Sequence, residues 1–350
     1  MALASGFPEA PDRCDDRAVP DPFAALSDRP RVELTMLPTP LERAPRLSRE
    51  LGVEVWLKRD DVGLLGLVGN KVRKLEFTLG EALAGGTDTV VTLGAPQSNH
   101  ARATASAAAR LGLHAVLVMG GKPPIGPPTG NLLLDALFGA EVLYAGTEEW
   151  AQLAAIVEAV AEERARAYTL PAGGSSPVGA LGFVAAYAEL LGQLEAVRVQ
   201  PQRVYHASTS GGTHAGLMLG QALARGGPRP VGFDVGQIVP DVRGLVTWLA
   251  NEAGALLGAD VALTEDDVDL DLSQLGDGYG AFTEAGMKAI GLLARTEGVV
   301  LDPVYSAKGM AGLIADARAG RVDGPVVFWH TGGGPSLFAA GWGERLLSTP

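Results

Sequence analysis

Two lysines stand three residues apart in the stretch VGNKVRKLE, residues 68 to 76, directly after a Gly-Asn pair. On helical geometry Lys71 and Lys74 share one face with apolar positions of the same segment. A buried ammonium needs an anion or must lose its proton, so the pair indicates an anionic ligand or a reactive amine. The alternative is that both lysines reach water at a frayed helix end. The same geometry predicts three charged residues on the opposite, solvated side of this helix: Arg73, Glu76 and Glu81.

A second polar stretch, TLGAPQSNHAR at residues 92 to 102, follows an apolar run and precedes an Ala-rich helical segment. Gln97, Ser98 and Asn99 supply more hydrogen-bond donors than one helix cap requires, and amide N–H groups at a helix N-terminus attract carboxylates. The pattern predicts a carboxylate site. Its alternative is an ordinary N-cap by Ser98 or Asn99.

The stretch STSGGTHAG, residues 208 to 216, also lies between an apolar run and a helical segment. Two adjacent glycines flanked by hydroxyl residues expose successive amide N–H groups, and the helix dipole adds positive potential there. This is the form of a phosphate site, although a tight turn with an N-cap remains the alternative. The stretch is neither a Walker A loop nor a GxGxxG fingerprint, which argues against a nucleotide-dependent α/β enzyme.

Two more polar stretches lead into helical segments near the C-terminus, LDPVYSAKGMAGL (301 to 313) and FWHTGGGPSLFA (328 to 339). Tyr305 and His330 are their conspicuous groups. A lone Tyr or His in such a place is more often a satisfied core side chain than a catalyst. We expect Lys308 to lie on the surface of its helix.

The elements that must position these groups alternate between strand and helix, which predicts an α/β protein with parallel sheets covered by helices on both faces. Ligand sites of such sheets lie beyond the carboxyl ends of the strands. The predicted strands are 53–58, 87–93, 114–119, 203–208, 230–235 and 325–330. The predicted helices are 70–84, 99–111, 129–138, 147–166, 177–193, 213–224, 282–296 and 307–318.

Composition limits the class of protein. With 350 residues and 47% hydrophobic content, we expect two lobes instead of one compact domain. The formal net charge of -12, without any basic run, makes nucleic acid and membrane surfaces unexpected partners. The single cysteine, Cys14, excludes a disulfide framework and fits a cytoplasmic protein, for which we expect no metal site. Residues 1 to 28 lack apolar periodicity and are predicted to form a mobile tail.

Together, GNKVRKLE, QSNHAR, GGTHAGL, LDPVYSAKGMAGL and HTGGGPSLFA resemble the pyridoxal-phosphate enzymes of the tryptophan synthase β-like fold. Within that fold, the chain is most similar to the D-cysteine desulfhydrase and 1-aminocyclopropane-1-carboxylate deaminase family, over about residues 35 to 340. The resemblance implies a homodimer. It implies a large cofactor-binding domain formed by residues 29–73 and 183–350, and a small domain formed by residues 74–182.

The resemblance also implies roles for individual residues. Lys71 would hold pyridoxal 5′-phosphate covalently and act as the base, and Lys74 would meet the cofactor phosphate. The phosphate site would be completed by Ser210, Gly211, Gly212 and Thr213. Asn99 would hold the pyridoxal 3′-oxygen, and Ser306 or Thr331 would lie near the pyridine nitrogen. The substrate would be bound by Gln97, Ser98, Asn99, Tyr279 and Tyr305, of which Ser98 and the two tyrosines would be catalytic together with Lys71.

The expected activity is an α,β-elimination on a small amino acid. The deaminases of this family carry Glu in the place of Ser306 and Leu in the place of Thr331. Neutral hydroxyls at both positions favour D-cysteine desulfhydrase, which would give pyruvate, ammonia and sulfide. The alternatives are a 1-aminocyclopropane-1-carboxylate deaminase, a cysteate sulfo-lyase, and a pyridoxal-phosphate-binding protein that has lost turnover.

Overall fold

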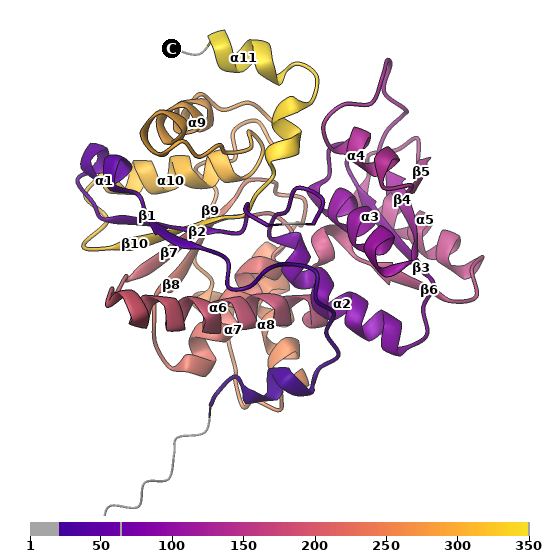
Figure 1. Ribbon diagram of the computed structural model, residues 1–350, viewed down its shortest axis with the longest axis horizontal. Coiled ribbons are helices and arrows are strands. Elements are labelled where there is room, and N and C mark those ends of the chain that lie inside the picture. The colour runs from indigo at the N-terminus through magenta and orange to yellow at the C-terminus, as the bar shows by residue number, and fades with distance from the viewer. Residues whose placement is uncertain (1–20, 64, 349–350) are drawn as a thin grey trace, which may run out of the picture.

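A computed structural model describes residues 21–63 and 65–348, which form two α/β lobes side by side (Figure 1). Strands alternate with helices in both lobes, as the sequence predicts. The sheet of the larger lobe has the order β1 (Leu41–Arg43), β2 (Val55–Arg59), β10 (Val326–His330), β7 (Arg203–Ser208), β8 (Arg229–Asp234) and β9 (Leu270–Asp271). The sheet of the smaller lobe has the order β5 (Glu141–Tyr144), β4 (His114–Met119), β3 (Thr89–Gly94) and β6 (Ala167–Leu170).

All neighbouring strands in both sheets are parallel except β1, which pairs antiparallel with β2. In the larger sheet β10 lies between β2 and β7, so three strands that are distant in the sequence end next to one another. Their carboxyl ends therefore meet at one edge of the larger lobe.

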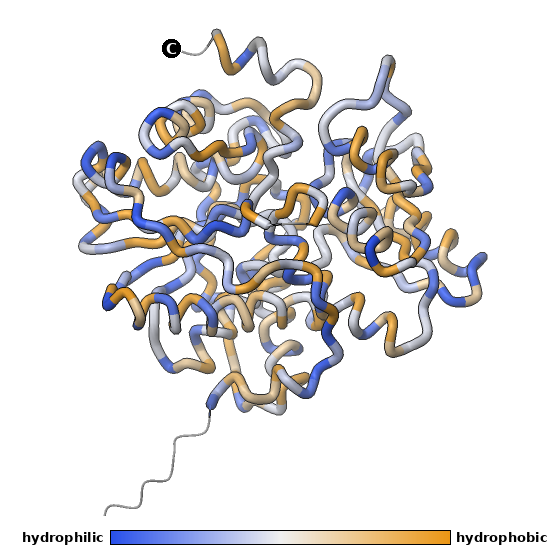
Figure 2. The backbone as a smooth tube through the Cα atoms, viewed as in Figure 1, coloured by the Kyte–Doolittle hydropathy of each residue, from blue (hydrophilic) through white to orange (hydrophobic). Residues whose placement is uncertain are grey.

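Helices cover both faces of each sheet. On one face of the larger sheet lie α1 (Pro45–Leu51), α9 (Glu284–Glu297) and α10 (Ser306–Arg318). On its other face lie α6 (Pro177–Val197) and α7 (Gly212–Ala224), with α8 (Val242–Leu256) packed behind them. The smaller sheet has α2 (Lys71–Ala84), α3 (Asn99–Leu111) and α4 (Asn131–Leu137) on one face and α5 (Trp150–Glu162) on the other. Figure 2 shows hydrophobic stretches running through both lobes.

Short elements join this framework. They are the 3-10 helices η1 (Ala24–Asp28), η2 (Ala172–Gly174), η3 (Glu265–Asp267) and η4 (Gly334–Phe338), and the C-terminal helix α11 (Trp342–Ser348). By length and composition α6 could span a membrane, but its apolar residues pack against α7, α8 and the larger sheet. In this fold α6 is therefore a core helix.

The six predicted strands and eight predicted helices are confirmed, with bounds that differ by a few residues. Four strands were not predicted, and these are β1, β5, β6 and β9, the outer strands of the two sheets. An outer strand is less buried than a central one and therefore lacks the continuous apolar run that reveals a buried strand. Three helices were also not predicted: α1, α8 and α11.

The predicted tail over residues 1–28 lies mostly outside the described residues. Its last part forms η1, and Phe23 and Leu26 pack against buried clusters of the larger lobe. The domain boundaries near residues 73 and 182 stay a prediction. They agree with the division of the strands, because residues 89 to 170 contain the whole smaller sheet.

The prediction of a solvated side for α2 was wrong at two of its three residues. Arg73 and Glu76 are 3% and 1% exposed, because α2 is buried on all sides near its start. The Arg73 guanidinium donates to both carboxylate oxygens of Asp60 at 2.9 Å and to Glu189 at 2.9 and 3.1 Å. Lys58 forms an ion pair with the same Glu189. This network fixes the helix that begins at Lys71.

Replacing Arg73 by Met should lower the free energy of unfolding by about 3–5 kcal/mol, since the Asp60 and Glu189 carboxylates would stay buried without their main partner. Urea denaturation at neutral pH measures this change. Arg110→Met is the matched control, because Arg110 is exposed on α3 and should change the value by about 0.5 kcal/mol or less. Equal stabilities for the two variants would contradict the assigned role of Arg73.

Candidate active site between the lobes

Four segments that follow strands converge between the lobes. The residues after β2, β10 and β7 bring Lys71, Thr331 and Ser210 to the edge of the larger sheet. The residues after β3 bring Ser98 and Asn99 from the smaller lobe. The site therefore lies where the fold predicts it, beyond the carboxyl ends of parallel strands.

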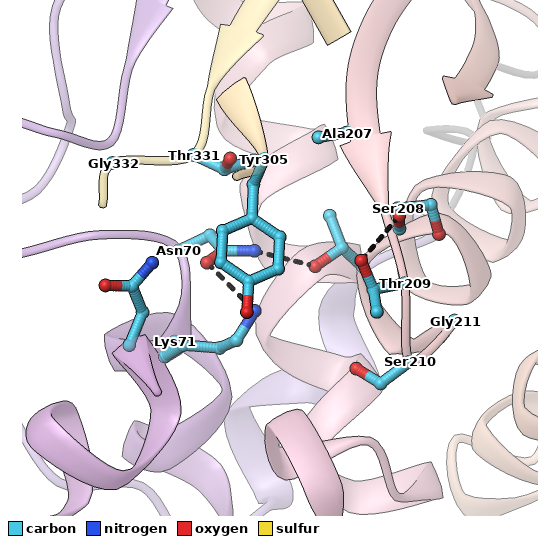
Figure 3. Close-up of a pocket in the computed structure, with 12 residues that line it drawn as sticks. Asn70, Lys71, Ala207, Ser208, Thr209, Ser210, Gly211, Tyr305, Thr331 and Gly332 are labelled. Carbon is cyan, nitrogen blue, oxygen red and sulfur yellow. Dashed lines mark hydrogen bonds between the residues drawn. The ribbon is translucent and has the colours of Figure 1, made fainter. Parts of the chain in front are cut away.

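One pocket lies against the larger lobe, at the edge where the carboxyl ends of its strands meet. Lys71 and Tyr305 point into it from different elements, with Ser210 and Gly211 on a further side (Figure 3). Its lining residues are Asn70, Lys71, Asn99, Ala207, Ser208, Thr209, Ser210, Gly211, Thr213, Tyr305, Thr331 and Gly332.

A second pocket opens from the same place toward the smaller lobe. It shares five residues with the first pocket: Lys71, Asn99, Thr209, Ser210 and Tyr305. It adds Ser98, His100, Trp150, Ile238 and Tyr279 as further lining groups. The two pockets are thus two parts of one site, and Lys71 lies where they join.

The Lys71 amine lies in an environment that disfavours its charged form. The pKa of Lys71 is lowered to about 8, mainly by burial; the Asp302 carboxylate opposes this shift, and the nearby Arg102 guanidinium adds to it. Its amine donates to the Asn70 side-chain oxygen at 3.3 Å, and the Asn70 amide donates in turn to Thr213. Lys71 can therefore supply a neutral amine close to neutral pH.

Lys74 is 1% exposed, and within the described part of the chain its ammonium has only neutral hydrogen-bond partners. It donates to the Gly173 carbonyl oxygen at 3.1 Å and to the Ser175 hydroxyl at 3.2 Å. Burial and the charge of Lys71 hold the pKa of Lys74 well below its usual value. A side chain at position 212 would come within 3.0 Å of the Lys74 nitrogen, so only glycine lets this cation approach the start of α7. An anion at the N-terminus of α7 would interact favourably with both the Lys74 ammonium and the start of that helix.

Tyr279 and Tyr305 form a pair on the other side of the site. Their hydroxyl oxygens are 2.5 Å apart, and the Tyr279 ring packs edge-on against Trp150. Burial raises the pKa of Tyr279, and burial together with Tyr279 raises that of Tyr305, so both hydroxyls stay protonated at neutral pH. One proton joins the two oxygens, and the second can be donated into the pocket.

The predicted site residues divide between lining and supporting positions. Ser98 caps α3 by accepting from the Ala101 amide at 3.1 Å, as the alternative reading states, and it also lines the second pocket. Gln97 lines neither pocket, because its side chain binds the backbone of Thr129 and Asn131. Gly212 lies behind the pocket, at the start of α7.

The residues from the two C-terminal stretches also divide. Ser306 is fully buried and donates to the Asp302 carboxylate at 2.5 Å, whereas Thr331 lines the first pocket. His330 is a satisfied core residue, with its ring nitrogens bonded to the Val300 and Gly332 backbone. The prediction that Lys308 lies on the surface was wrong, because its side chain is fully buried.

Sequence reasoning missed several lining or supporting residues. Ser175, in the stretch PAGGSSPVG between β6 and α6, had the signal of a Gly-rich loop between a strand and a helix. Arg102 and Trp150 sit inside or at the start of helices and carry no local signal for a ligand site. Only the tertiary fold brings them to Lys71 and Tyr279.

Arg102 links the site to the loop before Lys71. Its guanidinium is 1% exposed and donates to the carbonyl oxygens of Gly66 and Val68 at 2.8 and 3.0 Å. Residues 66 to 69 all have positive φ angles between 24° and 140°, which glycine adopts freely at positions 66 and 69 but which are unfavourable for Leu67 and Val68. Arg102 therefore holds the loop and contributes charge near the Lys71 amine.

Comparisons with known proteins agree with this geometry. The family described as "Pyridoxal-phosphate dependent enzyme" matches residues 32–332. A D-cysteine desulfhydrase from Salmonella typhi is 43% identical over 332 residues, covering 91% of this chain and 98% of its own. A Pyrococcus abyssi protein with the provisional name 1-aminocyclopropane-1-carboxylate deaminase is 42% identical over 330 residues, covering 93% of this chain and 97% of its own.

A solved structure described as an ACC deaminase homologue superposes with a TM-score of 0.87. It is 40% identical in sequence, and the match covers 95% of this chain and all of that one. The two-lobed fold with parallel sheets is thus the fold of this group.

Arg102→Gln should raise the pKa of Lys71 above about 8, because removing a neighbouring positive charge favours the ammonium form. The measurement is the pH dependence of the rate at which a small acylating reagent modifies the Lys71 peptide, followed by mass spectrometry. Arg102→Lys keeps the charge and should keep the midpoint, and so should Arg110→Gln on the exposed side of α3. A midpoint in Arg102→Gln equal to that of the unaltered protein would refute the electrostatic role.

Proposed function

Because the chain belongs to the family of pyridoxal-phosphate dependent enzymes, in the group of the 1-aminocyclopropane-1-carboxylate deaminases and D-cysteine desulfhydrases, we propose that it performs α,β-elimination on D-cysteine. The products would be pyruvate, ammonia and sulfide. The observation that carries the proposal is the position of the Lys71 amine, which lines one pocket together with Ser210, Gly211 and Tyr305, and the Tyr305 hydroxyl meets that of Tyr279.

The residues of the first pocket, together with Lys74, which lines neither pocket, fit pyridoxal phosphate. Lys74 and the start of α7 offer a phosphate site whose cation has no acidic partner among the described residues. The Ser208 hydroxyl lines the pocket and is buried without a hydrogen-bond partner. The amide group of Asn99 also lines it, at the junction of the two pockets. An anionic, polar and planar cofactor would satisfy these groups.

The chemistry divides between the cofactor and the protein. When bound, pyridoxal phosphate supplies a conjugated ring that accepts the electrons released at the substrate Cα. The Lys71 amine would first hold the cofactor and then take the Cα proton, for which a pKa of about 8 is well suited. The Arg102 charge and the buried surroundings keep that amine ready to accept a proton.

Ser98 and the tyrosine pair would act on the substrate. The Ser98 oxygen accepts from the Ala101 amide, so its own proton is free to be donated to a substrate carboxylate. Of the two tyrosine hydroxyl protons, one lies between Tyr279 and Tyr305, and the other would be donated to the leaving sulfur. Protonation at that atom makes sulfide a better leaving group.

The groups near the end of β10 favour elimination over ring opening. Thr331 offers a neutral hydroxyl to the pocket, and the Ser306 hydroxyl is already donated to Asp302. A neutral hydroxyl cannot keep a ring nitrogen protonated as the Glu of a deaminase would. This arrangement supports prompt loss of a substituent from the substrate β-carbon.

The two lysines should be separable by mutation. Lys71→Ala should abolish covalent attachment of the cofactor and lower turnover about a thousandfold or more. Lys74→Ala should leave covalent attachment detectable and weaken cofactor retention by about tenfold to a hundredfold, since one charged hydrogen-bond donor to the phosphate is lost. Visible absorption before and after dialysis distinguishes the two, and reversed behaviour would mean that the lysines are wrongly assigned.

The substrate proposal is tested by offering D-cysteine, 1-aminocyclopropane-1-carboxylate and cysteate to the cofactor-loaded protein. Production of 2-oxo acid and sulfide from D-cysteine, at a kcat/KM at least about tenfold above the other two, is the expected result. L-cysteine and the Lys71→Ala variant serve as controls. Preferred ring opening or sulfite release would instead assign one of the two related activities, and no turnover would leave only cofactor binding.

We also propose that the protein is a cytoplasmic homodimer. The resemblance supports the dimer, and the acidic, cysteine-poor sequence supports the location. The mass of the purified protein in solution tests the dimer directly.

A further inference from the structure

Lys308 is a buried cation that the proposed reaction does not use. It belongs to the first turn of α10 and is fully buried, as are only a few charged side chains among the described residues. Its ammonium donates to the carbonyl oxygen of Leu275 at 2.7 Å and more weakly to that of Gly278 at 3.4 Å. Burial lowers the pKa of Lys308, and the Asp302 and Asp277 charges oppose this shift. An ammonium that is costly to bury is thus held by main-chain carbonyls.

The backbone that Lys308 binds has little support of its own. Residues 275 to 280 form neither helix nor strand, and Gly276, Gly278 and Gly280 have φ angles of 69°, 133° and 71°. Glycine adopts such angles freely, but it also gives the unbound segment many other conformations. A fixed ammonium from a rigid helix limits those conformations.

Tyr279 is the residue whose position depends on this segment. It directly follows Gly278, one of the two carbonyls that Lys308 binds, and its hydroxyl meets that of Tyr305. Tyr305 is the N-cap residue of α10, three positions before Lys308. The start of α10 therefore contacts the 275–279 segment twice. The Lys308 side chain binds backbone carbonyls of the segment, and the Tyr305 hydroxyl meets the Tyr279 hydroxyl.

We propose that Lys308 is a positioning residue for Tyr279. The Lys308 ammonium serves as an internal monovalent cation bound by the Leu275 and Gly278 carbonyls. This inference rests on the proposed function in one respect, namely that Tyr279 faces the substrate. The carbonyl site itself does not depend on the reaction. Truncation of Lys308 should leave a space that a small cation can enter.

The first test is amide hydrogen exchange of the full-length protein, followed over the peptide that contains residues 272 to 280. Lys308→Ala should speed exchange in this peptide by about tenfold, with the central strands β3, β7 and β10 unchanged. Lys288→Ala is the matched control, because Lys288 is exposed on α9 and pairs only with Glu284 at its surface. Methylammonium, which resembles the removed end of the side chain, should restore slow exchange in Lys308→Ala.

Equal exchange in Lys308→Ala and the unaltered protein would overturn the proposal. Faster exchange throughout the chain would also overturn it, because it would mean that Lys308 supports the whole fold. The more conservative Lys308→Met variant fills the space without the charge, and it should show the same local effect. These readings need no substrate, so they decide the positioning role even if the proposed elimination fails.

Turnover provides the second test. Lys308→Ala should lower kcat several-fold and leave cofactor retention unchanged, because Lys308 touches neither pocket. When Tyr279 is already Phe, adding Lys308→Ala should cause little further loss, since both changes act through the same hydroxyl. Independent, multiplying losses in the double variant would contradict action through Tyr279.

Discussion

The rest of the structure must accommodate one unfavourable feature, the burial of two neighbouring ammonium groups. Lys71 and Lys74 lie one helical turn apart at the start of α2, and neither forms an ion pair within the described residues. Burying cations without anions is costly, and each charge makes the other less favourable. The cost is lowered if Lys71 gives up its proton and Lys74 receives an anion from outside. Both outcomes are requirements of a pyridoxal-phosphate enzyme, the family to which this chain belongs.

The fold keeps this unfavourable arrangement in place. The ion-pair network of Arg73, Asp60 and Glu189 fixes the start of α2. Arg102 crosses from the smaller lobe to the loop that leads into the helix. Strand ends, the start of α10 and the 275–280 segment supply the remaining groups, so the site is assembled from segments far apart in the sequence. The two lysines cannot relax toward water without disturbing these supports.

Much of this was predictable from the sequence, because parallel α/β folds place ligand groups in the loops after buried strands. The stretches with Ser98 and Ser210 were found in this way, whereas Lys71 was found from its position on a helix face and Tyr305 from a polar stretch that precedes a helix. The outer strands were not, since half-buried strands lack a continuous apolar run. Helical periodicity also failed at Arg73, because it assumes one solvated side and α2 is enclosed on all sides near its start. The same assumption gave the wrong location for Lys308, whose helix is almost completely buried over its first turns.

We propose that Lys71, and not Lys74, binds the cofactor covalently. The most direct measurement is borohydride reduction of the cofactor-loaded protein, followed by protease digestion and mass spectrometry of the peptides. We expect a reduced pyridoxyl group on Lys71 in nearly every molecule, with Lys74 unmodified. A label on Lys74, or no label on either lysine, would contradict the role proposed for Lys71.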